Sequence, residues 1–208
     1  SKKAARAAYD RLSPIYAALT SSERPLRRRA VALLGPLRGK LALEIGFGPG
    51  DSLVEMARGG ARVWGSDLSA GMARVASDRL RAAGFAGQAG LCTGDAVSLP
   101  YPAGVFDAIL MSFTLELFDT PEIPLVLAEC RRVLAPGGRL CIAAMARTPR
   151  QNAMVRAYEW FHKRFPAWVD CRPIPVREML EEAGFEIREE WRGSTWGLPV
   201  AVVVTGPG

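Results

Sequence analysis

The sequence has little of what most metal and redox sites need. It contains one histidine, His162, in 208 residues. Its cysteines lie far apart, without the short spacings of a zinc knuckle or a redox pair, and no group of His, Asp and Asn residues has metal-ligand spacing. We therefore expect no metal, and four reduced, mostly buried thiols, because free cysteine behaves as a small apolar side chain. They are Cys92, Cys130, Cys141 and Cys171.

Long apolar runs are also missing. No run approaches the ~18 residues needed to cross a bilayer. The first ten residues, SKKAARAAYD, lack the apolar middle of a signal peptide. Hydrophobic residues make up 49% of the chain and charged residues 23%, which is close to the average for soluble globular proteins and argues against disorder. We expect a single cytoplasmic domain covering residues 1–208.

Positive charge is concentrated near the start of the chain. Residues 1–40 contain ten Lys and Arg against Asp10 and Glu23, so they carry +8 and the other 168 residues carry −2. Within them, RPLRRRAVALL (residues 24–34) predicts a basic amphipathic helix that ends near Gly35. Its arginines, Arg24 and Arg27 to Arg29, favour weak contact with an anionic membrane surface. The alternative is that Leu26, Ala30, Leu33 and Leu34 pack on the rest of the protein and the arginines face water.

Short apolar runs then alternate with helical patterns. Strands covered on both faces are predicted at 40–46, 61–66, 105–111 and 139–145. Helices are predicted at about 51–58, 70–83 and 120–134, the second capped by Ser69. Repeated strand–helix–strand units predict a doubly wound α/β layer with a parallel sheet. Helices at 150–165 and 175–183, the latter ended by Gly184, and strands at 185–192 and 198–205 complete the pattern.

A glycine-rich turn follows the first predicted strand, in LALEIGFGPG (residues 41–50). A dinucleotide fingerprint needs a third glycine three residues after the second, but Asp51 stands there. A Walker loop needs a lysine and a Ser or Thr after the last glycine, and GPGDSL has no lysine. The remaining ligands are those that need close backbone approach without a phosphate cradle.

Three carboxylates follow three successive strands. Glu44 ends the first strand, where it would repel a phosphate and attract a cation. Asp67 ends the second, where a carboxylate can accept two ribose hydroxyls, and Asp95 follows a third strand, within reach of an adenine amino group. Since the carboxyl ends of parallel strands line one crevice, the three are expected to lie together. A ligand with an ammonium, a sulfonium, a ribose and an adenine fits this set, and S-adenosylmethionine has all four.

An ordered set of motifs carries a family resemblance. The stretches are YDRLSPIY, LALEIGFGPG, VWGSDLSAGM, GDAVSLPYPAGVFDAILMSFTLE and ECRRVLAPGGRLCIAAM. From Tyr9 to about Ala146 the chain resembles the class I S-adenosylmethionine-dependent methyltransferases. Within them it is most similar to the branch of ubiquinone and menaquinone biosynthesis C-methyltransferases and small bacterial phospholipid N-methyltransferases. The resemblance implies a Rossmann-like fold with a mostly parallel, seven-stranded sheet and helices on both faces.

The resemblance also implies cofactor-binding residues. Gly46, Gly48 and Gly50 would pass beside the methionine part of S-adenosylmethionine, and Glu44 would orient it. Asp67 would hold the ribose, with Leu68 and Met72 against the adenine. Asp95 and Ala96 would meet the adenine edge, and Ser112 would lie under the methionine. Tyr9 and Tyr16 would belong to a helical lid formed by residues 1–38.

Several of these residues have ordinary structural alternatives. Asp67 and Asp95 can be helix caps or turn formers. Met72 can simply belong to the core, and Tyr9 and Tyr16 can pack locally. His162 is a candidate general base, but packing on a helix explains it as well.

The acceptor is less clearly defined by the sequence. The resemblance implies transfer of a methyl group to a small, lipophilic molecule, a quinone precursor or a phospholipid headgroup amine, with S-adenosylhomocysteine as product. The stretch MSFTLELF lacks the Asn or Asp with two prolines of DNA-base methyltransferases, and it offers only Glu116 where arginine methylation needs two glutamates. Nucleic acid and arginine are therefore disfavoured as substrates.

A helical insertion at 147–183 is expected to lie over the acceptor site. Its aromatic and basic residues are the candidates for the acceptor pocket: Tyr158, Phe161, His162 and Arg172. A different class of function is a catalytically silent S-adenosylmethionine-binding module that regulates or assembles other proteins. The presence of Glu44, Asp67 and Asp95 together favours the enzyme.

Overall fold

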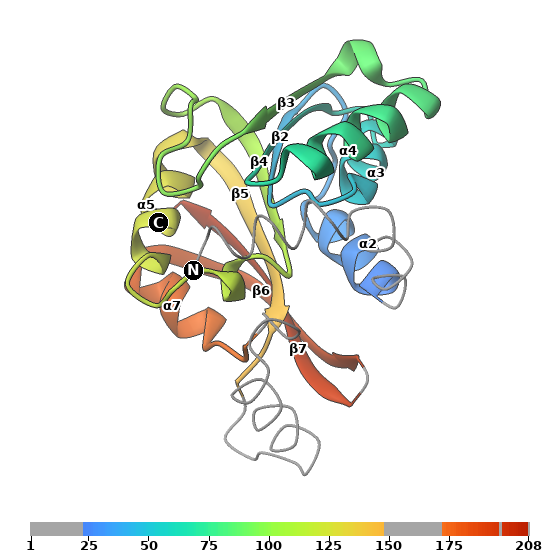
Figure 1. The fold of residues 1–208 in the computed structure, drawn as a ribbon. Helices are drawn as coiled ribbons and strands as arrows, with labels where there is room; N and C mark the ends of the chain where they lie inside the picture. The colour runs from blue at the N-terminus through green and yellow to red at the C-terminus, as the bar shows by residue number, and fades with distance from the viewer. Residues whose placement is uncertain (1–22, 148–171, 196, 208) are drawn as a thin grey trace.

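A computed structural model describes residues 23–147, 172–195 and 197–207 (Figure 1). Within them, the strands form one seven-stranded sheet in the order β3-β2-β1-β4-β5-β7-β6. Neighbouring strands from β3 to β5 are parallel, and β7 is antiparallel to both β5 and β6. The strands are β1 (Leu41–Ile45), β2 (Arg62–Asp67), β3 (Ala89–Thr93), β4 (Phe106–Ser112), β5 (Leu134–Met145), β6 (Phe185–Thr195) and β7 (Leu198–Pro207).

Helices cover both faces of the sheet (Figure 1). One layer contains α2 (Arg24–Leu33), α3 (Asp51–Arg58) and α4 (Ala70–Ala82). The opposite layer contains α5 (Ile123–Val133) and α7 (Val176–Glu182). Strand β1 shows why two layers are needed: Ala42 packs with the first layer and Leu43 with the second, as the two-residue period of a strand requires. The doubly wound fold with helices on both faces is therefore confirmed.

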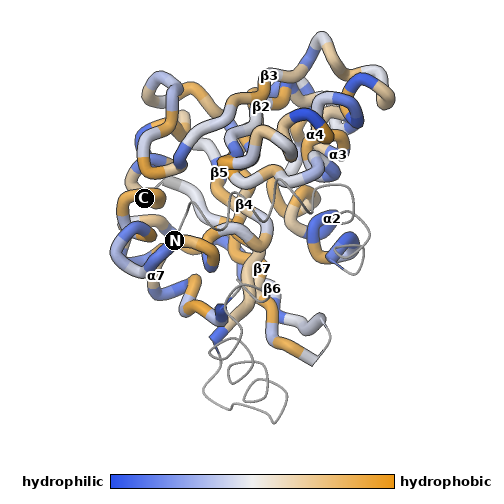
Figure 2. The backbone as a smooth tube through the Cα atoms, in the orientation of Figure 1, coloured by the Kyte–Doolittle hydropathy of each residue, from blue (hydrophilic) through white to orange (hydrophobic). Residues whose placement is uncertain are grey.

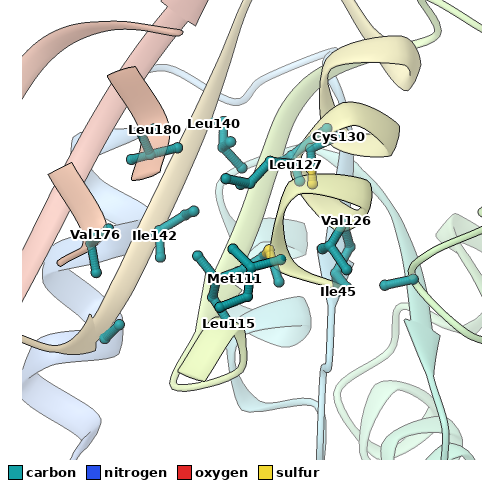
Figure 3. Close-up of a cluster of buried hydrophobic side chains, with 14 of the residues drawn as sticks. Ile45, Met111, Leu115, Val126, Leu127, Cys130, Leu140, Ile142, Val176 and Leu180 are labelled. Carbon is teal, nitrogen blue, oxygen red and sulfur yellow. The ribbon is translucent and has the colours of Figure 1, made fainter. Parts of the chain in front are cut away.

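The layer with α5 and α7 encloses a dense apolar cluster. Figure 3 shows Met111 of β4 and Ile142 of β5 between Leu127 of α5 and Leu180 of α7. Each such side chain contributes about 1.5–3 kcal/mol when fully buried. Figure 2 shows the corresponding pattern along the chain, with apolar strands inside and hydrophilic turns outside.

Local signals placed the helix ends correctly. Ser69 caps α4, since its Oγ accepts a hydrogen bond from the amide of Met72 at 3.1 Å. Gly35 follows α2 with φ of 82°, and Gly184 follows α7 with φ of 78°, a left-handed conformation in which glycine avoids steric cost. Cys130 and Cys141 are buried free thiols, and Cys92 is a half-buried one, as expected. Cys171 lies outside the described residues.

The apolar face of α2 packs on the sheet. Leu26, Ala30 and Leu34 are buried, and α2 shares a cluster with Ala143 of β5 and Val202 of β7. Residues 24–34 of segment 1–38 are thus a layer of the core, and a lid stays a prediction for the rest of that segment. The same packing removes that face from any membrane surface, which leaves Arg24, Arg28 and Arg29 exposed on the outer side. None of the described helices is long and apolar enough to span a membrane.

The described end of segment 147–183 also belongs to the core. Ile174 pairs with Ala146 at the end of β5, and Val176 and Leu180 of α7 lie in the cluster of Figure 3. Residues 172–183 therefore complete the second helical layer, and an insertion over the acceptor site stays a prediction for the rest of the segment.

Candidate functional site

The glycine turn joins β1 to α3 at the carboxyl edge of the sheet. All three glycines have positive φ: 69° at Gly46, 49° at Gly48 and 83° at Gly50. A Cβ on Gly46 would lie 2.2 Å from Thr114 Cγ2, and one on Gly50 would lie 2.7 Å from the Cβ of Ala76. Around Gly48, by contrast, no atom of the described residues lies within 4 Å of such a Cβ. Gly46 and Gly50 are thus required by packing, and Gly48 leaves open space at the turn.

This difference separates folding from binding. We expect Gly48→Ala to cost about 1–2 kcal/mol of unfolding free energy, the cost of a left-handed alanine. Gly46→Ala should cost about 2–5 kcal/mol, because the clash with Thr114 adds to the same strain. Gly48→Ala should nevertheless weaken binding of S-adenosylmethionine at least tenfold, since its methyl group enters the open space. Chemical denaturation and calorimetry measure the two effects, and unchanged affinity in Gly48→Ala would place the cofactor elsewhere.

Asp67 connects the ends of β1 and β2. Its Oδ2 accepts the amide of Gly48 at 2.9 Å, and its Oδ1 accepts the amide of Ser69 at 2.8 Å. The second bond is the local turn role that the sequence allowed. The first spans 19 residues and holds the glycine turn against β2. Asp67 therefore lies beside the glycine turn and fixes its position relative to β2.

Of the residues expected around the adenine, some lie at the ends of strands and others are buried in the apolar clusters. Asp95 follows β3, and its Oδ1 accepts the amide of Val97 at 3.2 Å, the turn role weighed as an alternative. Leu68 is half-buried beside Asp67. Met72 is 1% exposed and belongs to the apolar cluster under α4, so the structure favours its core role. The side chain of Ala96 is likewise buried, in the cluster on the other face.

Glu44 is a carboxyl group inside the protein. Its side chain lies on the β1 face covered by α3, the residue is 2% exposed, and its Oε2 has no hydrogen-bond partner among the described residues. Burial raises the pKa of Glu44 to about 8. A buried polar atom without a partner is unusual, and a cationic ligand would satisfy it.

The turn after β4 was not predicted as part of the site, apart from Ser112. Ser112 ends β4, and its buried Oγ has no partner in the described part of the chain. Phe113 has φ of 53°, a conformation that bulky residues rarely adopt and that tends to occur at functional sites. Thr114 then donates its hydroxyl to the carbonyl of Gly46 at 3.3 Å. The turn after β4 therefore lies directly against the glycine turn.

Glu116 is a second buried carboxyl group on the same turn, in the short 3-10 helix η3 (Leu115–Leu117). It is 1% exposed, and its Oε1 accepts the amide of Met145, at the end of β5, at 3.1 Å. Burial raises its pKa to about 8. One weak signal for it is visible in the sequence, an acidic residue in an otherwise apolar stretch.

Arg172 is the one predicted acceptor residue within the described chain. It donates to the Thr120 hydroxyl at 2.8 Å and to the Phe118 carbonyl at 2.9 Å, on the same connection as Glu116. Its role toward an acceptor stays a prediction. The other candidates lie outside the described residues: Tyr9, Tyr16, Tyr158, Phe161 and His162.

The carboxyl edge of the sheet therefore suits a nucleoside that carries an amino-acid group. It combines an open glycine turn at Gly48, a buried Glu44 carboxyl whose Oε2 has no partner among the described residues, and carboxylates after β2 and β3. Among residues 23–147, 172–195 and 197–207, no group of His, Cys, Asp and Glu side chains has the arrangement of a metal site.

Comparison with known proteins points the same way. Residues 42–138 match the model of a methyltransferase domain. A demethylmenaquinone methyltransferase of Thermobifida fusca is 35% identical over 91% of this chain and 86% of its own length. A nocamycin O-methyltransferase of Saccharothrix syringae is 32% identical over 95% of this chain and 78% of its own.

The fold is shared with solved structures. Magnesium protoporphyrin IX methyltransferase from Synechocystis, crystallised with bound S-adenosylhomocysteine, superimposes with a TM-score of 0.73 at 22% identity. The superposition covers 90% of this chain and 84% of that protein.

Proposed function

Because the chain belongs to the class I S-adenosylmethionine-dependent methyltransferases, we propose that it methylates a ring carbon of a hydroxylated quinone precursor. The chain is an enzyme that uses S-adenosylmethionine as its cofactor. The observation that carries the choice of acceptor is the 35% identity with a demethylmenaquinone methyltransferase over 91% of the chain.

Within this proposal, each residue at the carboxyl edge binds a different part of the cofactor. Glu44 binds the ammonium group with Oε2, the carboxyl oxygen that has no partner in the described part of the chain. Asp67 receives the ribose hydroxyls, and Asp95 receives the adenine amino group. The backbone at Gly48 contacts the methionine part, where a side chain would intrude. When bound, the cofactor supplies a methyl group on a positively charged sulfur.

The chain's own contribution to the reaction is alignment and exclusion of water. Holding two reacting groups in line is worth up to about 7–11 kcal/mol of the barrier. Gly46 and Thr114 fix the glycine turn against the turn after β4, so cofactor and acceptor meet at a defined junction. A rigid junction of this kind lowers the entropy cost of bringing the reactants together.

The alternatives to a ring-carbon acceptor are a hydroxyl oxygen, a phospholipid amine and a module without catalytic activity. A hydroxyl oxygen is the second candidate, because the relative from Saccharothrix syringae is an O-methyltransferase. The phospholipid headgroup amine expected from the sequence has no support from the relatives compared above. The silent-module alternative predicts cofactor binding without turnover of any acceptor.

Contact with an anionic membrane surface remains a separate prediction. It would now involve Arg24, Arg28 and Arg29 without the leucines, since the apolar face of α2 is packed on the sheet. Arg28 also lies 3.9 Å from the carboxylate of Glu55, and Arg29 lies over the ring of Trp191 at 4.7 Å, so these charges already have partners. The structure thus favours the packing alternative for this helix.

An acceptor panel tests the proposed function. The full chain is incubated with methyl-labelled S-adenosylmethionine and, in separate reactions, a prenylated 1,4-naphthalenediol kept reduced with dithionite, a phenol with no free ring position, and phosphatidylethanolamine vesicles. We expect label in the naphthalenediol alone. Label in the blocked phenol would favour O-methylation, and label in none of them, with cofactor bound, would favour the silent module.

A further inference from the structure

The buried carboxyl group of Glu116 has no assigned task in cofactor binding. We propose that Glu116 accepts the hydroxyl proton of the acceptor during methyl transfer, an inference that rests on the proposed methylation of a hydroxylated ring. Three observations carry it: the place of Glu116 at the carboxyl edge, its unpartnered oxygen, and its charged surroundings.

Glu116 lies where acceptor and cofactor must meet. It is on the connection that leaves β4, next to β1 at the point where the strand order reverses and ligands bind in open α/β sheets. Two residues before it, Thr114 bonds to the glycine turn through the Gly46 carbonyl. Leu115 anchors the connection in the apolar cluster beside Met111 (Figure 3). Glu116 is therefore held on a fixed support next to the cofactor crevice.

One oxygen of the Glu116 carboxyl accepts a hydrogen bond, and the other has no hydrogen-bond partner among the described residues. The amide of Met145 donates to Oε1 at 3.1 Å, while Oε2 is buried and has no partner in the described ranges. Nearly all buried polar atoms in proteins have a partner, because an unmet one is costly. An acceptor hydroxyl on Oε2 would supply the missing hydrogen bond.

The surroundings of Glu116 suit proton transfer near neutral pH. Burial is the main cause of its raised pKa, the Met145 amide opposes it, and the nearby carboxylate of Glu23 adds to it. Glu23 is itself paired with Arg27, at 3.0 Å. A general base acts best when its pKa lies near the operating pH, and an ordinary glutamate lies well below that.

Proton transfer to Glu116 accompanies formation of the new carbon–carbon bond. The acceptor O–H bond breaks, its proton binds Glu116 Oε2, and the electron pair moves through the ring to the carbon beside the hydroxyl-bearing carbon. That carbon bonds to the methyl carbon as the carbon–sulfur bond breaks, and the sulfur keeps the bonding pair and becomes neutral. The ring carbon then loses its own proton to water, which leaves an aromatic phenolate. Glu116 Oε2 returns its proton to the phenolate oxygen, which restores the diol and leaves Glu116 ready for the next turnover.

Binding of two ligands without cofactor tests the contact directly. The ligands are 4-methoxy-1-naphthol, which has a hydroxyl, and 1,4-dimethoxynaphthalene, in which that hydroxyl is methylated. We expect the full chain to prefer the naphthol by about tenfold, the value of one hydrogen bond. Glu116→Met, which fills the space without an acceptor, should lose this preference, and Glu116→Gln should keep part of it. Fluorescence titration measures all four affinities.

Turnover separates hydrogen bonding from proton transfer. Glu116→Gln should reduce kcat for the prenylated naphthalenediol by about 10²- to 10⁴-fold, the usual contribution of a general base. Its unfolding midpoint should equal that of the parent. Its affinity for S-adenosylmethionine should stay within twofold of the parent's. Asp119→Asn, an exposed change on the same connection, is the matched control and should leave kcat unchanged.

The outcomes are distinguishable. If the parent methylates the naphthalenediol and Glu116→Gln does so at the same rate, the role of Glu116 is overturned and the proposed function stands. Equal loss of affinity for both ligands in Glu116→Met would mean a purely structural role and also overturns it. If the parent methylates no naphthalenediol but still prefers the naphthol through Glu116, the proposed function fails and the contact stands.

Discussion

Asp67→Ala should weaken S-adenosylmethionine binding by ~2 to 4 kcal/mol, which is about 30- to 1000-fold. Two charge-assisted hydrogen bonds to the ribose are worth about 1.5–3 kcal/mol each, less what water restores. The structure adds a second cause. The same carboxylate holds the amide of Gly48 at 2.9 Å, so alanine also loosens the glycine turn. Calorimetric titration of both proteins with the cofactor measures the difference.

Two further variants divide these causes. Asp67→Asn keeps one oxygen for a backbone amide but removes the charge, and it should fall between the parent and alanine. Asp78→Ala removes an exposed aspartate of α4 that pairs with Arg81 and should bind the cofactor as the parent does. Parent-like affinity in Asp67→Ala would mean that the ribose is not held at the end of β2.

The affinity for S-adenosylmethionine should rise by about 30-fold between roughly pH 5.5 and 7, a range below the α-amino pKa of about 7.7–8.0 in which the ligand's ammonium stays charged. Burial raises the pKa of Glu44 to about 8 in the free protein. A bound ammonium favours the charged carboxylate and lowers that pKa. Binding therefore releases a proton, and affinity increases as pH rises toward about 8, by close to tenfold per pH unit.

Glu44→Gln provides the control. Glutamine fills the same space without titrating, so its cofactor affinity should be weaker at pH 7 and nearly constant over the range. Titration at pH 6.5 in two buffers with different ionisation enthalpies counts the released protons. The parent should release close to one and the variant close to none, and equal release from both would assign the proton to another group.

Much of the fold follows from local signals in the sequence. Predicted strand 40–46 is observed as Leu41–Ile45 and predicted helix 51–58 as Asp51–Arg58, because glycines bound an apolar run in the first and an amphipathic pattern in the second. Helix 24–34 was also predicted correctly as a helix. Its packing partner was left open between the rest of the protein and a membrane surface, since an amphipathic stripe looks the same on a sheet and on a membrane. Only the tertiary structure shows Ala30 buried against the sheet.

Part of the candidate site could also be predicted from the sequence. The order of strands and carboxylates placed Glu44, Asp67 and Asp95 at one edge of the sheet. The turn after β4 escaped notice because its features depend on tertiary contacts. Nothing in the letters SFTLE indicates that Phe113 has a positive φ, or that Glu116 meets the end of β5. A lone glutamate in an apolar stretch is the only local signal, and surface glutamates produce the same signal.

The position of the transferred methyl group tests the central claim most directly. A prenylated 1,4-naphthalenediol with deuterium at its free ring position is incubated anaerobically with the full chain and S-adenosylmethionine, and the product is analysed by mass spectrometry. We expect a product that has gained a methyl group and lost the ring deuterium, because the new bond forms at that carbon. A methylated product that keeps the deuterium, or cofactor binding with no methylated product at all, would contradict it.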